Sequence, residues 1–318
     1  MSLYLVTGGA GFIGSNIVEA LLQRGDQVRI LDNFSTGKRE NIHNVRDRLE
    51  IIEGDIRSYH VVREAVDGVE FVLHQAALPS VPRSIKDPLT SNEVNVTGTL
   101  NILNAAREAR IKRLVYASSS SIYGDLETLP KTEDMLPKPL SPYAVSKMAG
   151  EKYCMVFHTL YGLETVALRY FNVFGPHQDP TSQYSAVIPK FVSAMLQGKA
   201  PLIYGDGQQS RDFTFVANVV RANLLACEHG LEDVSGQVFN IATGRRITLN
   251  KLVETLNEIL GTEIQPQYAD ARPGDVKHSL ANIGKAQQFL GYQPQADLRT
   301  GLQAVVDWMK ENTEKGKR

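Results

Sequence analysis

Leu3-Tyr-Leu-Val-Thr7 runs directly into Gly8-Gly-Ala-Gly-Phe-Ile-Gly14 at the start of this 318-residue chain. The first stretch has the pattern of a buried parallel strand, and the residues after the glycines indicate a helix. Gly8, Gly11 and Gly14 have the spacing that allows a tight turn, close approach of a pyrophosphate to the backbone, and close packing of helix on strand. The stretch therefore predicts a dinucleotide-binding βα unit.

A second predicted strand, Gln27-Val-Arg-Ile-Leu31, ends on Asp32. Dinucleotide folds place an acid at about this distance from the glycines, where it accepts hydrogen bonds from the ribose hydroxyls and repels a 2′-phosphate. Asp32 therefore favours NAD over NADP. Lys38 and Arg39 follow closely and could meet a phosphate, so the sequence leaves NADP open.

The strands that follow end in small or polar residues. Leu49 to Glu53 leads into Gly54-Asp-Ile56, and Val69 to His74 leads into Gln75-Ala-Ala77. Strands and helices alternate as far as Thr165 to Tyr170, which predicts an α/β fold with a Rossmann-type, doubly wound parallel sheet. The cofactor contacts expected along its carboxyl edge are Gly8, Gly11, Phe12, Ile13, Gly14, Asp32, Asn33, Asp55, Ile56, Gln75, Ala76 and Ala77.

The pattern changes after Asn172 to loops rich in glycine, proline, glutamine and aspartate. We predict an NAD-binding domain formed by residues 1–172 with 211–243. Residues 173–210 with 244–318 are predicted to form a smaller C-terminal α/β lobe that binds the substrate.

A helix is expected to begin after Ser141-Pro142 and to carry Tyr143 and Lys147. Residues i and i+4 share a helix face, so the phenol and the ammonium should be neighbours. A free tyrosine, with a pKa of about 10, is a poor base, and a nearby cation favours the phenolate. Such a pair occurs by chance on many helices, and it needs a cofactor and an alcohol. The serine run Ser118-Ser-Ser-Ser121 could fix that alcohol.

Composition restricts the possible partners. The formal net charge is -1, the hydrophobic content is 42% and the charged content is 22%, so nothing indicates nucleic acid or an anionic membrane. No apolar run is near the length of a bilayer span, and no signal peptide is apparent, so a cytoplasmic location is expected. Seven scattered histidines predict no metal site, and Cys154 and Cys227 are expected to stay reduced.

Together these motifs resemble the extended short-chain dehydrogenase/reductases, and within them the nucleotide-sugar 4-epimerases. The resemblance covers nearly the whole chain. It implies an NAD-dependent isomerase that acts on a UDP-sugar through a transient 4-keto sugar and forms a homodimer. The segments that carry it are Thr7 to Ser15, Asp32, Gly54-Asp-Ile56, the serine run before Ile122-Tyr-Gly124, Tyr143-x-x-x-Lys147 and Arg169-Tyr-Phe-Asn172.

The resemblance also implies roles for single residues. Tyr143, Lys147 and Ser119 would be catalytic, with Ser121 as a second hydroxyl near the sugar. Asn95 and Tyr170 would join Tyr143 and Lys147 in the cofactor site. Asn172, Arg211 and Arg272 would contact the diphosphate, Asp275 the ribose and Tyr204 the uracil. The full set of substrate contacts implied is Ser80, Arg83, Ser119, Ser120, Asn172, Ala186, Val187, Tyr204, Arg211, Arg272, Asp275 and Ser279.

One position bears on substrate size. Epimerases restricted to UDP-glucose and UDP-galactose carry a bulky tyrosine where this chain has Ser279, so there is room for an N-acetyl group. The segments 77–84, 184–189 and 274–280 are similar to bacterial UDP-N-acetylglucosamine 4-epimerases, although Pro79 replaces their usual glycine. UDP-GlcNAc and UDP-GalNAc are therefore the expected pair, and UDP-Glc and UDP-Gal stay open.

Three other functions share parts of this pattern. Nucleotide-sugar dehydratases place an Asp-Glu pair just after the catalytic hydroxyl, where this chain has Ser120 and Ser121, which argues against dehydration. A UDP-uronic acid 4-epimerase or decarboxylase stays open, because Arg83 could receive a carboxylate. A non-catalytic NAD-binding sensor would not need Tyr143, Lys147 and Ser119 together.

Overall fold

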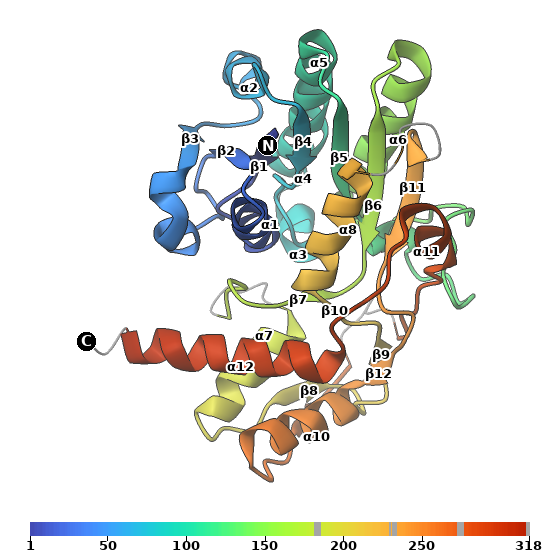
Figure 1. Cartoon of the computed structure of the whole chain (residues 1–318). Coiled ribbons are helices and arrows are strands. Elements are labelled where there is room, and N and C mark those ends of the chain that lie inside the picture. Colours follow the sequence, from blue (N-terminus) through green and yellow to red (C-terminus); the bar gives the residue numbers. More distant parts are fainter. Residues whose placement is uncertain (181–185, 229, 231–233, 272–276, 316–318) are drawn as a thin grey trace.

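The computed structural model describes residues 1–180, 186–228, 230, 234–271 and 277–315. At its centre is a seven-stranded sheet in the order β11-β6-β5-β4-β1-β2-β3, with all neighbours parallel (Figure 1). This arrangement confirms the predicted Rossmann-type α/β fold. The strands are β1 (Leu3–Thr7), β2 (Gln27–Asp32), β3 (Leu49–Glu53), β4 (Phe71–His74), β5 (Arg113–Ser119), β6 (Thr165–Tyr170) and β11 (Gln237–Ile241).

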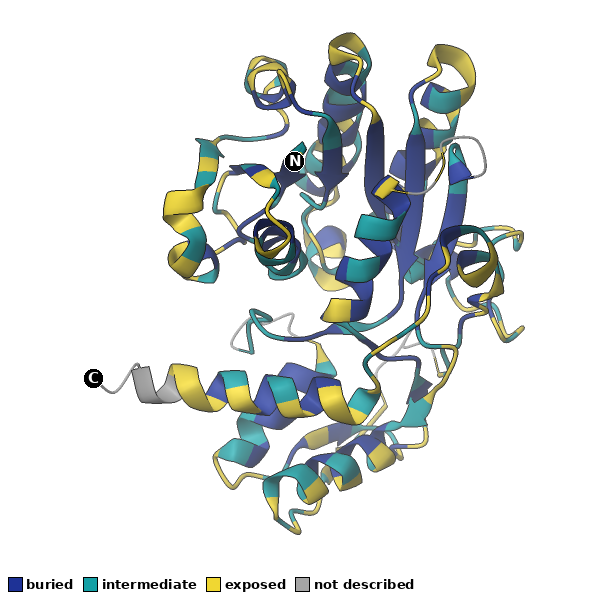
Figure 2. Cartoon of the chain, viewed as in Figure 1, coloured by how far each residue is buried: buried dark blue, intermediate teal, exposed yellow. Residues whose placement is uncertain are grey.

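Helices cover both faces of the sheet, because its strands are apolar on both sides. In β1, Tyr4 and Val6 face one core and Leu5 faces the other. The first core is covered by α1 (Phe12–Gln23), α8 (Val216–Glu228) and α11 (Gly284–Leu290). The second is covered by α2 (Tyr59–Val66), α5 (Thr99–Ala109) and α6 (Pro142–Tyr161). The strands of the sheet are mostly buried, apart from the edge strand β3, and exposed residues lie along the outer faces of the helices (Figure 2).

Short helical segments complete this half of the molecule. They lie in connections between strands of the sheet, and one of them is a π-helix that runs into α5. Their bounds are η1 (Arg39–Arg48) and η3 (Ser120–Tyr123), both 3-10 helices, α3 (Val81–Lys86), α4 (Pro88–Asn92) and the π-helix η2 (Glu93–Gly98).

The smaller lobe has a core of its own, in which Phe191, Ile203, Leu252 and Val306 are buried together. Figure 1 places this lobe below the carboxyl ends of the sheet strands. Three of its helices pack against one another, and its short strands pair in three two-stranded ladders instead of one sheet. Its elements are β7 (Val173–Phe174), α7 (Val187–Leu196), β8 (Leu202–Tyr204), β9 (Ser210–Arg211), β10 (Thr214–Phe215), β12 (Ile247–Thr248), α10 (Leu249–Leu260), β13 (Gln267–Ala269) and α12 (Leu298–Lys315).

Two segments cross the predicted division between the halves. Phe213 packs in the core of the lobe, whereas Ala286 and Leu290 of α11 pack in the core of the sheet. Tyr292 follows α11 and donates a hydrogen bond to the Ala242 carbonyl at 2.9 Å, which fastens the segment beside β11. We therefore propose that the NAD-binding domain also includes the segment around α11.

The glycine-rich turn sets the edge at which a site forms. Gly8 has a left-handed φ of +67°, and a Cβ on Gly14 would lie only 2.1 Å from the Gly8 carbonyl oxygen. Helix α1 can therefore approach β1 this closely only without a side chain there. The N-cap residue of α1 is Gly11, which has no side chain to accept from the first N–H groups of the helix, and these groups suit an anionic ligand.

Candidate active site

A cavity of about 510 Å³ lies at the carboxyl edge of the sheet, where the predicted cofactor residues meet. Parallel strands bring residues that are far apart in sequence to one edge. It therefore has the position, the glycine-lined wall and the uncapped helix end that a dinucleotide needs. The predicted residues lining it are Gly8, Gly11, Phe12, Ile13, Gly14, Asp32, Asn33, Asp55, Ile56, Gln75, Ala76, Ala77, Tyr143, Lys147 and Tyr170.

Asp32 is held rigidly at the end of β2, with 8% of its surface exposed. One carboxylate oxygen accepts the Ala10 N–H at 2.9 Å, and the other accepts the Phe34 N–H at 2.8 Å. Burial raises the pKa of Asp32, and the two backbone donors partly offset that rise. Each oxygen can still accept a further hydrogen bond, as ribose recognition requires.

The two cations that left NADP open are both engaged within the protein. Lys38 Nζ lies 2.8 Å from a carboxylate oxygen of Asp179, and Arg39 Nη2 lies 2.6 Å from one of Glu53. The Arg39 guanidinium also lies 3.9 Å from the centre of the Phe34 ring. These contacts favour NAD, because a 2′-phosphate would have to compete for both cations.

His177 and Asp179 also line the cofactor cavity, although no sequence motif predicts them there. His177 has a left-handed φ of 70°, and its Nδ1 is hydrogen-bonded to Ser15 Oγ at 2.8 Å. Asn16 of α1 also donates to the Pro176 carbonyl at 3.2 Å. The loop after β7 is therefore hydrogen-bonded to α1. These contacts join segments that are far apart in the sequence, and no local motif predicts them.

Helix α6 is started by a side-chain cap. Ser141 Oγ accepts the Ala144 N–H at 3.2 Å, and Pro142 occupies the first turn, where no donor is needed. The Tyr143 N–H donates to Ser84 Oγ at 3.0 Å, which ties α6 to α3. These contacts fix Tyr143 where the helix begins, at the cavity wall.

Tyr143 and Ser119 come together as predicted. Ser119 is the last residue of β5, and its Oγ accepts the Ser121 N–H at 3.2 Å. Burial raises the pKa of Tyr143, and a hydrogen bond with Ser119 lowers it. Ser121 Oγ is buried and, among the residues described, has no hydrogen-bond partner. The Ser119 hydroxyl thus lies beside the phenol, whereas the Ser121 hydroxyl is buried nearby in the chain with its hydrogen-bonding capacity unused within the described residues.

Lys147 is 4% exposed, and its Nζ donates to the Ala117 carbonyl at 2.8 Å. The ammonium also lies 5.1 Å from the centre of the Tyr116 ring. Burial lowers the pKa of Lys147 from 10.5 to about 8. A charged lysine at neutral pH is therefore costly here, and an electron-rich neighbour such as a phenolate would offset the cost.

Asn95 is buried behind the cavity wall instead of lining it. Its Oδ1 accepts the Leu78 N–H at 2.7 Å, and its Nδ2 donates to Leu78 O at 3.2 Å and to Ser146 Oγ at 3.0 Å. The side chain thus connects the loop after β4 with α6. This places Asn95 beside the lysine-bearing helix, as the resemblance implied, but one layer away from the cavity.

A second cavity, also of about 510 Å³, lies in the smaller lobe. Asn172 Nδ2 donates to Ser279 Oγ at 3.3 Å, so Ser279 lies next to the lining without forming part of it. The residues Arg272 and Asp275 fall outside the described part of the chain. The predicted substrate contacts that line this cavity are Asn172, Ala186, Val187, Tyr204 and Arg211.

Ser80 and Arg83 stand at the start of α3. Ser80 has a positive φ of 103°, and its Oγ accepts the Arg83 N–H at 3.3 Å. Pro79, the departure noted in the sequence, lines the cofactor cavity. The predicted residues that line neither cavity are Ser80, Arg83, Asn95, Ser119, Ser120, Ser121 and Ser279.

Among the described residues, no group of three or more His, Cys, Asp or Glu side chains is arranged to hold a metal ion. Cys154 and Cys227 are both buried and form no disulfide. Within the same residues, none of the helices combines the length and the hydropathy needed to traverse a lipid bilayer.

Comparison with known proteins gives consistent results. The family model of the NAD dependent epimerase/dehydratase family matches residues 4–242. A putative UDP-glucose 4-epimerase of Methanocaldococcus jannaschii is 40% identical over 98% of this chain and 99% of its own length. The solved UDP-N-acetylglucosamine 4-epimerase of Methanobrevibacter ruminantium, in complex with UDP-N-acetylmuramic acid, is 42% identical, with a TM-score of 0.93 over 98% of this chain and 99% of that one.

A further similar structure carries both a cofactor and a substrate. It is UDP-glucuronic acid 4-epimerase from Bacillus cereus with UDP-glucuronic acid and NAD. It is 33% identical, with a TM-score of 0.89 over 98% of this chain and 99% of that one. The agreement extends over almost the full length of each chain, and so over both lobes.

We expect Lys147→Met to stabilise the NAD-free protein at neutral pH. Above a pH of about 10.5 the lysine is uncharged in the folded and in the unfolded protein, so no charge is buried on folding. Between a pH of about 10.5 and about 8 the lysine is protonated in the unfolded chain but not in the folded protein, so the free energy of unfolding falls as the pH falls. Below a pH of about 8 both states are protonated, and this loss of stability stays constant. The variant also loses the hydrogen bond to Ala117, which offsets part of the effect. We expect its free energy of unfolding to exceed that of the parent by about 2 kcal/mol near pH 7, and by less towards pH 10.5.

Urea unfolding of both proteins at each pH measures this difference. Lys199→Met, at an exposed lysine, is the control and should change little at either pH. A Lys147→Met protein less stable than the parent near pH 7 would contradict the burial argument.

Proposed function

We propose that this chain, which belongs to the NAD-dependent epimerase/dehydratase family, inverts carbon 4 of a UDP-hexose, with UDP-N-acetylglucosamine and UDP-N-acetylgalactosamine as its main pair. The observation that carries the proposal is that Tyr143 and Lys147 both line the cofactor cavity and that Tyr143 is hydrogen-bonded to Ser119 at the end of β5. This group can move a proton at an alcohol next to a hydride acceptor. The relatives described above act on UDP-sugars and support that choice of alcohol.

The cofactor is NAD, which when bound accepts a hydride from carbon 4 and returns it, so that the sugar passes through a 4-keto form. The chain offers this cofactor the glycine turn, the uncapped start of α1 and the Asp32 carboxylate. A Cβ on Gly14 would lie 2.1 Å from the Gly8 carbonyl oxygen, so α1 can lie this close to the turn only with glycine at that position. These features fit NAD by their shape and by their donors and acceptors.

In this proposal Tyr143 takes and returns the proton of the 4-hydroxyl. Lys147 makes the phenolate accessible near neutral pH by placing a positive charge close by, and Ser119 holds the hydroxyl in line. The buried position of Lys147 strengthens its influence, because a charge in a poorly hydrated site acts at lower effective dielectric. Ser121, whose hydroxyl is buried without a partner among the described residues, would be the second hydroxyl near the sugar, although it lines neither cavity.

Inversion requires that the keto sugar present its other face, so the chain should hold the nucleotide firmly and the sugar loosely. Asn172, Tyr204 and Arg211 line the second cavity and offer an amide, an aromatic ring and a guanidinium. These groups suit a uridine diphosphate. We propose that this cavity holds the nucleotide and that Ser279, beside Asn172, lies near the N-acetyl group.

A UDP-uronic acid is the alternative substrate. Arg83 lies on α3, whose next residue, Ser84, bonds the Tyr143 N–H at 3.0 Å. A cation on an element attached to the catalytic helix could receive a carboxylate. The Bacillus cereus relative acts on UDP-glucuronic acid and gives this alternative a precedent.

The direct test is to incubate the purified protein, without added NAD, with UDP-GlcNAc, UDP-Glc and UDP-glucuronic acid separately, and to separate the products by chromatography. We expect UDP-GalNAc from the first and slower turnover of the second. Tyr143→Phe, the control, should bind UDP-sugar and lose nearly all turnover, because the proton acceptor is gone. A Tyr143→Phe enzyme at the wild-type rate would refute the mechanism, and turnover of the uronic acid alone would favour the alternative.

Ser279→Tyr should narrow the substrate range. A phenol in place of the small hydroxyl beside Asn172 would fill the space proposed for the N-acetyl group. We expect kcat/KM for UDP-GlcNAc to fall about a hundredfold, with a much smaller change for UDP-Glc. Ser279→Ala, which keeps the space open, is the matched control. Equal losses for both sugars would show that Ser279 does not set the size limit.

We also propose that the chain forms a homodimer through α6. This helix exposes several large apolar side chains, and exposed apolar patches on a protein surface mark interaction sites. They are Val145, Tyr153, Val156, Leu160 and Tyr161. Analytical ultracentrifugation should give a dimer for the parent and for Tyr268→Glu, a control at an exposed residue of the lobe, and a monomer for Val156→Glu. A monomeric parent would rule this surface out as a self-association site.

A further inference from the structure

Glu151 is a fully buried acid on the helix that carries Tyr143 and Lys147. Residues i, i+4 and i+8 share one helix face, so the three side chains form a stripe along α6. The mechanism proposed above gives Glu151 no task. A buried carboxylate is costly, and its place in this stripe therefore calls for an explanation.

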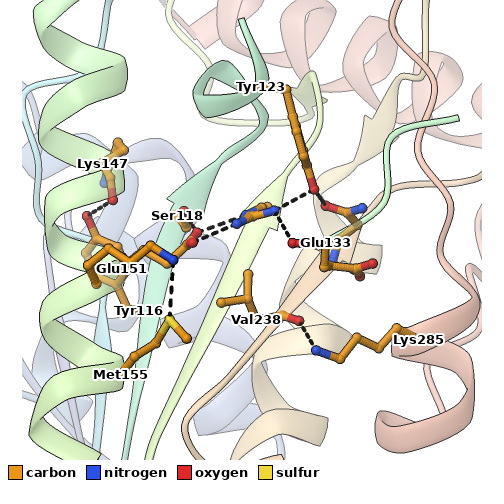
Figure 3. Close-up of polar contacts among 12 residues, drawn as sticks. Tyr116, Ser118, Tyr123, Glu133, Lys147, Glu151, Met155, Val238 and Lys285 are labelled. Carbon is orange, nitrogen blue, oxygen red and sulfur yellow. Dashed lines mark hydrogen bonds and ion pairs between the residues drawn. The ribbon is translucent and has the colours of Figure 1, made fainter. Parts of the chain in front are cut away.

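The carboxylate makes three hydrogen bonds, and both partners are buried. One oxygen accepts from Ser118 Oγ at 2.8 Å and from Arg169 Nε at 2.9 Å, and the other accepts from Arg169 Nη2 at 2.7 Å. Figure 3 shows Glu151 reaching from α6 to Ser118 on β5. Arg169 lies on the neighbouring strand β6, paired with Ser118 in the register of the sheet.

Arg169 extends these connections to a third strand. Its Nη1 donates to the Tyr123 hydroxyl at 2.7 Å, and that hydroxyl donates to Asn240 Oδ1 on β11, also at 2.7 Å (Figure 3). The same nitrogen donates to the Glu133 carbonyl at 3.3 Å. One carboxylate on α6 is thus coupled to β5, β6 and β11.

We propose that the Glu151–Arg169 ion pair is a positioning element that sets the helix bearing Tyr143 against the strand bearing Ser119. Lys147 holds Ala117, and Glu151, one turn later, holds Ser118. Two attachments one turn apart restrict both sliding and rotation of α6 over β5. This role rests on the proposed epimerase function, because it concerns the geometry of the proton-transfer group.

The close packing of α6 on β5 supports this role independently. A Cβ on Gly150, next to Glu151, would lie 2.3 Å from the Tyr116 hydroxyl. Helix and strand are therefore in contact at this point, and a small displacement of α6 would carry Tyr143 with it. Displacements of about 1 Å can reduce an enzymatic rate about a hundredfold.

Stability alone does not account for the pair. Replacing a buried ion pair by apolar residues of similar volume is often neutral or stabilising, whereas removing one partner is strongly destabilising. The apolar double variant Glu151→Leu/Arg169→Met therefore separates the two roles. We expect an unfolding temperature close to that of the parent, unchanged NAD content, similar KM for UDP-GlcNAc, and a kcat lower by about a hundredfold.

Two single variants complete the set. Glu151→Gln should lower both the unfolding temperature and kcat, because it leaves the Arg169 charge buried and unpaired. Arg113→Met is the matched control, since Arg113 is also fully buried on β5 and donates to the Ala226 carbonyl at 2.7 Å, but it lies at the opposite end of the strand from Ser119. It should lose stability without losing kcat.

A readout that does not depend on sugar turnover is the ¹⁹F resonance of Tyr143 in protein labelled with 3-fluorotyrosine, assigned by its absence in Tyr143→Phe. We expect the ¹⁹F chemical shift of Tyr143 to change in the double variant and to stay the same in Arg113→Met. A stable double variant with parental kcat and an unmoved resonance would overturn the proposal. If the parent itself turns over no UDP-sugar, the epimerase function fails, and the resonance alone then decides the positioning role.

Discussion

The attachment of helix α6 to strand β5 is the contact on which the rest of this active site depends. The Lys147 ammonium bonds the Ala117 carbonyl at 2.8 Å, and Gly150 lets the helix lie directly on Tyr116. Both contacts bring the start of α6 to the end of β5, where Ser119 stands. The chemistry therefore depends on how one helix lies on one strand, and the sheet gives that strand a fixed place.

In this arrangement ionisable groups whose charge is costly to bury lie at the candidate active site. Lys147 and Asp32 are both buried, and burial shifts the pKa of each towards its uncharged form. In the proposed function bound partners would satisfy these groups, a ribose for Asp32 and a phenolate for Lys147. The remainder of the fold, with two apolar cores around the sheet, carries the stability that the site lacks.

The sequence predicted the elements whose signal is local. The strand Thr165 to Tyr170 was predicted with the bounds it has, because all of its residues are buried in a parallel sheet and its apolar run is continuous. The glycine turn and Asp32 were likewise recognisable, because close packing and ribose recognition each demand a particular residue type. Strand β5 extends into the serine run as far as Ser119, although serines do not resemble strand residues.

Features that arise from contacts between distant segments could not be read in advance. Phe213 joined the core of the lobe, and α11 returned to the core of the sheet, because each was placed by long-range packing. Glu151 is one acid on a helix, and nothing near it in sequence announces Arg169 as its partner. His177 reaches the cofactor cavity in the same way, across a contact with Ser15.

Substrate labelled with deuterium at carbon 4 shows whether a hydride leaves that carbon and returns to its other face. UDP-GlcNAc carrying the label would be incubated with the protein without added NAD, and the inverted product examined by mass spectrometry and NMR. We expect UDP-GalNAc that retains deuterium at carbon 4, because in the proposed reaction the hydride that is removed from carbon 4 returns to it within one site. Inversion with loss of the label to solvent, or no inversion of any UDP-sugar, would contradict it.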